Sequence, residues 1–110
     1  MVYMTEQITR VRDALKNALS SVFHYTAFQS PPPYAVWQEE TEGESVHGND
    51  GKDIQVIQGS IDFFTATDLD PLVDKIQEEL SAKKISYRLN SVQYEEETGL
   101  IHYEWIWEVG

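Results

Sequence analysis

Hydrophobic and polar residues alternate most clearly near the C-terminus of the chain. Residues 86–95 and 100–109 are both rich in aromatic and β-branched residues, and a short polar break that ends in Gly99 separates them. Such a pattern is typical of a β-hairpin, with Gly99 supplying the positive φ of a three- or four-residue turn. The sequence therefore predicts that the chain ends in a hairpin.

The register of this hairpin follows from pairing Glu95 with Leu100, because side-chain direction alternates along a strand. The pairs expected on one strongly apolar face are Tyr94 with Ile101, Val92 with Tyr103, Asn90 with Trp105, and Arg88 with Trp107. The other face then carries Tyr87, Leu89 and Ile106 among polar side chains. We therefore expect a second, mixed face that two helices on one side of the sheet would leave uncovered.

An amphipathic helix is predicted near the N-terminus. Thr5 is a suitable N-cap, and apolar residues recur from Ile8 to Val22 at three- and four-residue spacing. Arg12 and Lys16 lie off this apolar stripe. The helix is expected to cover the core, and the short apolar run 22–25 either extends the helix or links it to the next element.

A second amphipathic helix is predicted in the C-terminal half. Asp68 or Asp70 would cap it, and Pro71 suits its first position. Its apolar stripe is formed by Leu69, Leu72, Val73, Ile76 and Leu80, and Lys83 and Lys84 follow at the C-terminal end, where cations suit the helix dipole.

Two further strands are predicted between the helices, at Tyr34–Glu40 and Ile54–Thr65. Gly59, inside the longer strand, indicates a bulge or the close approach of a helix. The two strands would form a hairpin across the polar segment Thr41–Asp53. The order α-β-β-α-β-β predicts one α+β domain spanning residues 1–110, in which two helices pack on one face of a four-stranded, mostly antiparallel sheet.

Charge is unevenly distributed along the chain, whose net charge is −11. Residues 1–37 hold three basic and two acidic side chains, whereas residues 38–110 hold five basic and 17 acidic ones. An acidic surface repels phosphate backbones, so specific nucleic-acid binding is not expected. The excess either provides solubility, or complements a basic partner, or lines a passage in which DNA must not adhere.

Candidate chemistry is sparse. The chain has no cysteine, its three histidines show no ligand-like spacing, and no glycine-rich phosphate loop or nucleophile elbow is present. We therefore expect no catalysis, no metal and no cofactor. His102 is expected to be structural, and Glu95–Glu97 are interpreted as a solvated hairpin tip. No apolar run is long enough for a membrane span, so a cytoplasmic protein without membrane contact is expected.

The polar segment Thr41–Asp53 is the remaining candidate for function. It contains three glycines and few apolar residues, so we expect it to be mobile and to form a contact surface or channel lining in an assembly. A dispensable insertion is the alternative. The interface residues predicted from the sequence are Glu42, Glu44, Asp50, Asp53, Tyr87, Leu89 and Ile106.

Four segments together carry a family resemblance that extends over most of residues 8–109. They are Val22–Tyr25, Pro32–Glu39, Gln58–Asp62 and Leu89–Val109. In these segments the chain resembles small proteins encoded in the structural gene clusters of tailed phages and prophages of Gram-positive bacteria. That group is similar to tail completion proteins, also described as head–tail joining or tail terminator proteins. The resemblance follows a pattern and contains no catalytic motif, so it transfers no site residues.

The resemblance implies a virion assembly protein that self-associates and docks without catalysis. Its partners would be phage tail-tube and connector or neck proteins, and it would form a homo-oligomeric ring in the virion, which is compatible with a monomer in solution. It would occupy the bacterial host cytoplasm during assembly and then the virion. The alternative is a small acidic regulatory or inhibitor protein that binds a basic host protein surface.

Overall fold

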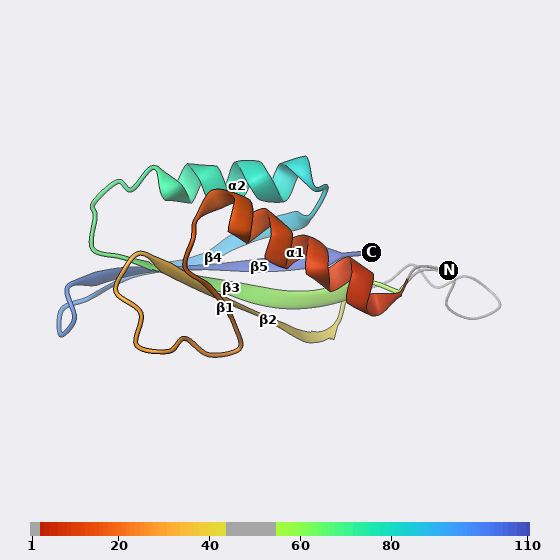
Figure 1. Cartoon of the computed structure of the whole chain (residues 1–110), viewed down its shortest axis with the longest axis horizontal. Coiled ribbons are helices and arrows are strands. Elements are labelled where there is room, and N and C mark those ends of the chain that lie inside the picture. The colour runs from red at the N-terminus through yellow and green to blue at the C-terminus, as the bar shows by residue number, and fades with distance from the viewer. Residues whose placement is uncertain (1–2, 44–54) are drawn as a thin grey trace.

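Two helices lie on one face of a five-stranded sheet (Figure 1). A computed structural model describes residues 3–43 and 55–110. The elements, in chain order, are α1 (Met4–Ala18), β1 (Val22–His24), β2 (Tyr34–Glu42), β3 (Ile57–Thr65), α2 (Leu72–Ala82), β4 (Ser86–Glu95) and β5 (Leu100–Val109). The α+β class predicted from the sequence is thereby confirmed.

The predicted four-stranded, mostly antiparallel sheet is wrong. The sheet has the order β1-β2-β3-β5-β4 and is mixed, because β1 pairs in parallel with β2. Val22–His24 was expected to extend the helix or to link it, but α1 ends at Ala18 and Leu19 is already extended. A three-residue strand is too short to show an alternation of its own, so only its pairing with β2 reveals it.

The β2–β3 hairpin is confirmed, with shifted ends. β2 continues to Glu42, two residues beyond the predicted end, and β3 begins at Ile57. The pairing shifts between Glu39 and Thr41, so the bulge lies in β2. A Cβ atom at Gly59 would lie 2.1 Å from the carbonyl oxygen of Gln38 and 2.3 Å from the ring of Trp107. The close approach at this glycine is therefore made by backbone and an indole, and not by a helix.

The predicted hairpin register is correct near the turn and wrong further away. Glu95 pairs with Leu100, and Gly99 has φ +71° with its N–H donating to the Glu95 carbonyl at 2.8 Å. The β4–β5 pairing then shifts between Leu89 and Ser91. Beyond this bulge Leu89 pairs with Trp105 and Tyr87 with Trp107, instead of Asn90 and Arg88. The extra residue moves Tyr87 and Leu89 to the helix side of the sheet.

The core lies between this face and the two helices. Trp105 and Trp107 are fully buried on β5, beneath helix residues Val11, Leu15, Ile76 and Leu80. A buried indole N–H needs an acceptor. Trp107 donates to the Ser60 carbonyl at 2.9 Å, and Trp105 donates to the Gln77 side chain at 3.0 Å. Each tryptophan is thus held by a directional bond in addition to packing.

An acidic side chain caps the start of α2, and an arginine of α1 binds the backbone that follows its end. Thr5 does not cap α1, whose N-cap is Tyr3. Asp70 accepts the backbone N–H of Leu72 at 2.9 Å, which confirms an acidic cap for α2, although Pro71 is the N-cap and not the first helical residue. The Arg10 guanidinium donates to the carbonyls of Lys83 and Lys84 after the end of α2. A cation at this end also complements the helix dipole.

We expect Gly59→Ala to destabilise the protein by about 3 kcal/mol or more, because overpacking against backbone forces strands or rings apart. Gly99→Ala is the matched control. No atom lies within 4 Å of the added Cβ there, so only the positive φ costs energy, about 1 kcal/mol. Urea unfolding of both variants measures the difference, and equal losses would contradict the packing at Gly59.

Candidate functional site

The distal half of the β4–β5 hairpin is one candidate surface. The hairpin projects beyond both helices, which end before its tip (Figure 1). Val92 and Tyr94, in this half, are 50% and 65% exposed, and Leu89, in the other half and opposite Trp105, is 48% exposed. Val92 pairs with Tyr103, so these apolar side chains share the face that the helices cover elsewhere. The hairpin thus carries apolar side chains of the kind found in the core to a part of the sheet that the helices do not cover.

The tip of this hairpin is an ordered acidic turn. The Thr98 hydroxyl accepts the N–H of Leu100 at 3.2 Å and lies 3.3 Å from the Glu95 carboxylate. Glu96 and Glu97 are exposed. They lie directly beyond Tyr94, so negative charge adjoins exposed apolar surface.

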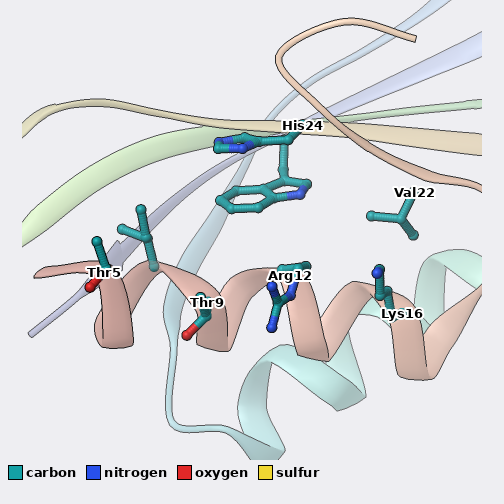
Figure 2. Close-up of a pocket in the computed structure, with 8 residues that line it drawn as sticks. Thr5, Thr9, Arg12, Lys16, Val22 and His24 are labelled. Carbon is teal, nitrogen blue, oxygen red and sulfur yellow. The ribbon is translucent and has the colours of Figure 1, made fainter. Parts of the chain in front are cut away.

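A groove between α1 and the β1 edge of the sheet is the second candidate surface (Figure 2). Its volume is about 290 Å³, close to the lower end of the range for ligand pockets. It is lined by Thr5, Ile8, Thr9, Arg12 and Lys16 of α1 and by Val22, His24 and Trp37 of the sheet. The groove therefore has apolar and aromatic walls and a polar helix rim.

Two of the residues that line the sheet side of the groove, His24 and Trp37, belong to a stack of three rings. The His24 ring lies between those of Trp37 and Tyr25, with centroid distances of 3.9 Å on each side and interplanar angles of 8° and 19°. Glu39 fixes the stack, because His24 Nε2 lies 2.6 Å from one carboxylate oxygen and the Tyr25 hydroxyl donates to the other at 2.7 Å. Ring contacts and two hydrogen bonds to one carboxylate therefore hold the stack together.

The same bonds shift two pKa values. Burial raises the pKa of Glu39, but the hydrogen bonds from Tyr25 and His24 outweigh it, so the pKa lies below the usual value of 4.5. The hydrogen bond to Glu39, with smaller contributions from desolvation and the carboxylate charge, raises the pKa of Tyr25. Glu39 is therefore held as a carboxylate.

Two cations flank the groove on the helix side (Figure 2). Arg12 pairs with the adjacent Asp13 at 3.1 Å, and both side chains are about half exposed. Within the described residues, Lys16 has no hydrogen bond or ion pair. Lys16 is therefore a cation on this rim that is suited to pair with an acidic group.

The face of the sheet opposite the helices carries a row of aromatic rings. Phe23, Tyr34, Phe64 and His102 follow one another across four strands, with centroid distances of 6.4, 4.9 and 4.3 Å. His102 lies on this mixed face, as predicted.

His102 lies near two carboxylates on this face and is hydrogen-bonded to one of them. Its Nε2 lies 2.7 Å from Asp62 Oδ1, and its Nδ1 lies 3.9 Å from Glu95. Burial raises the pKa of Asp62, and the nearby Glu104 and Glu40 raise it further, against the opposing effect of His102. His102 is therefore held by a hydrogen bond to Asp62, and its structural role stays a prediction.

The predicted interface residues that the structure describes, Glu42, Tyr87, Leu89 and Ile106, lie at different places on the sheet. Tyr87 is half-buried against the core, and Leu89 lies on the helix side, so their predicted place on the mixed face is wrong. Ile106 is on the mixed face, opposite Arg88. Glu42, at the end of β2, accepts a hydrogen bond from Gln55 at 3.2 Å. Glu44, Asp50 and Asp53, with most of the Thr41–Asp53 segment, lie outside the described residues.

Sequence reasoning missed the groove. Thr5, Thr9, Arg12 and Lys16 recur at helical spacing beside the apolar stripe of α1, and this polar row was the available signal. This polar row borders a groove only because β1 lies beside α1, and β1 was not expected. The exposure of Val92 and Tyr94 was also missed, because alternation predicts the face of a residue but not where the covering helices end.

No protein-family model matches the chain, and no curated protein matches it. Within residues 3–43 and 55–110, no group of three or more histidine and acidic side chains is placed to hold a metal ion. In the same part of the chain, neither helix is long and apolar enough to cross a membrane.

We expect Glu39 to contribute stability that is lost in acid. Its folded-state pKa is lowered, so the contribution is complete above the unfolded-state pKa and disappears as the pH falls through the folded one. The stability difference between the wild type and Glu39→Gln should therefore shrink between about pH 6 and about pH 3. Urea unfolding across this range measures it.

Glu78→Gln, which removes an exposed carboxylate on α2, controls for the loss of one negative charge. A constant difference between the wild type and Glu39→Gln down to the lowest pH would contradict the role assigned to Glu39.

Proposed function

We propose that this chain is a phage virion assembly protein that completes the tail or joins it to the head, by self-association and docking and without catalysis. The observation that carries the proposal is the hairpin that projects beyond the helices, on which Val92 and Tyr94 are 50% and 65% exposed. Apolar surface rimmed by charge marks an interaction site on a folded protein. The resemblance over four segments supplies the biological setting.

The hairpin suits docking because its exposed side chains stand on paired strands. Val92 and Tyr94 pair with Tyr103 and Ile101 of β5. The backbone of both strands is therefore already ordered, and binding costs little conformational entropy. The partners would be tail-tube and connector or neck proteins and further copies of this chain. Assembly would take place in the host cytoplasm, and the protein would remain in the virion.

The acidic composition supports the same role. A head–tail passage has to let DNA slide without adhering, and a net charge of −11 repels phosphate. An acidic regulator that binds a basic host protein would share this charge. The two functions are therefore distinguished by the appearance of the phage particles that form without this protein.

Deleting the gene from the phage or prophage that encodes it tests the proposal. We expect filled heads and separate tails by electron microscopy, and restoration of joined particles when the wild-type protein is supplied in trans. Normal, infectious particles from the deletion would overturn the proposal. Altered timing of gene expression with normal particles would instead favour the regulator.

A double variant, Val92→Thr with Tyr94→Thr, separates docking from folding. Threonine is β-branched and suits strands, and both positions are exposed, so the free energy of unfolding should change by about 1 kcal/mol or less. Supplied to the deletion strain, this variant should fail to restore joined particles. The control Phe28→Thr alters a side chain that is 82% exposed outside the hairpin and should restore them. Full restoration by the double variant would show that the hairpin is not the docking surface.

A further inference from the structure

The two candidate surfaces lie at opposite edges of one sheet and are complementary. The groove adjoins β1 and the hairpin tip belongs to β4 and β5, and β1 and β4 are the outer strands. We propose that the groove between α1 and β1 receives the hairpin tip of a second copy of this chain. This inference rests on the self-association in the proposed function and assigns the two surfaces that carry it.

Charge identifies the tip as the occupant. The groove rim carries Lys16, which has no hydrogen bond or ion pair within the described residues, and Arg12, which also pairs with Asp13. On the tip, the exposed Glu96 and Glu97 have no hydrogen bond or ion pair within the described residues. Complementary charge favours this pairing and opposes tip-to-tip or groove-to-groove contact.

Shape and apolar character agree with this choice. The groove has walls formed by Ile8, Val22 and Trp37 and a volume of about 290 Å³, enough for one large side chain and the atoms around it. Tyr94 precedes the acidic tip and is 65% exposed. Tyrosine, with an apolar ring and a polar end, is enriched at protein interfaces. Its hydroxyl would reach the row of threonines on α1, and its ring would meet the stacked wall.

The contact would be heterologous, because the tip and the groove are different surfaces. Each copy would insert its tip into one neighbour and receive the tip of another. Such an interface forms a closed ring if the rotation between copies closes, and a filament if it does not. Contact in either case fills every groove and covers the apolar end of every hairpin except at free ends.

Cysteine cross-linking tests this contact directly, because the chain has no cysteine of its own. Thr9→Cys places one thiol in the groove, and Glu97→Cys places one at the tip. When the two folded proteins are mixed and oxidised, we expect the mixed disulfide dimer to form at least about tenfold faster than with Glu78→Cys, a control on the exposed side of α2. A rate equal to the control would overturn the proposal, as would faster formation of either homodimer.

Charge reversal shows whether the stated residues make the contact. Arg12→Glu on the Thr9→Cys protein, or Glu96→Lys on the Glu97→Cys protein, should each slow the cross-link about tenfold. Combining the two reversed proteins should restore the rate. Damage to folding would not be restored by mixing, so failure of restoration would overturn the assigned pairing. Circular dichroism of each variant confirms that it is folded.

The cross-linking result is independent of particle assembly. If the cross-link fails while the gene deletion still leaves heads and tails unjoined, the proposed function stands and the interface is wrong. If the cross-link forms while the deletion gives normal particles, the interface stands and the proposed function is wrong.

Discussion

The indole of Trp107 lies against Gly59, and the rest of the sheet depends on this contact. A Cβ atom at residue 59 would overlap both the ring and the Gln38 carbonyl, so β2, β3 and β5 can lie in this register only with glycine at that position. The ring is fully buried and its N–H is bound to Ser60. Burial of the Trp107 ring, its hydrogen bond and the absence of a side chain at Gly59 therefore act at the same place. Together they fix the central strands beneath the helices.

Both candidate surfaces follow from this arrangement. With the central strands fixed, the helices cover only part of the long β4–β5 hairpin, and its distal residues Val92 and Tyr94 remain exposed. At the other edge, β1 extends the sheet beside α1 and leaves the groove with its His24–Trp37 wall. Arg10 ties α1 to the end of α2, so the helix rim of the groove is anchored to the body of the protein.

Local patterns in the sequence predicted what depends on neighbouring residues. The α+β class, the pairing of Glu95 with Leu100 and the positive φ of Gly99 follow from alternation and turn chemistry, and the structure confirms them. Contacts between distant segments were not predictable in this way. The parallel strand β1 has three residues and no pattern of its own, and the bulge at Asn90 leaves no trace in an alternating sequence. Tyr87 and Leu89 were placed on the wrong face for that reason, and the groove was missed because it requires β1.

The central claim is that this chain is a working part of the assembled particle, and the composition of purified virions tests it most directly. Quantitative mass spectrometry of gradient-purified, tailed particles from the encoding phage or prophage would count the chain against the major tail-tube protein. The account predicts a fixed number of several copies in every particle, retained after washing at high salt and absent from heads that lack tails. Purified infectious particles that contain none of this chain would contradict it.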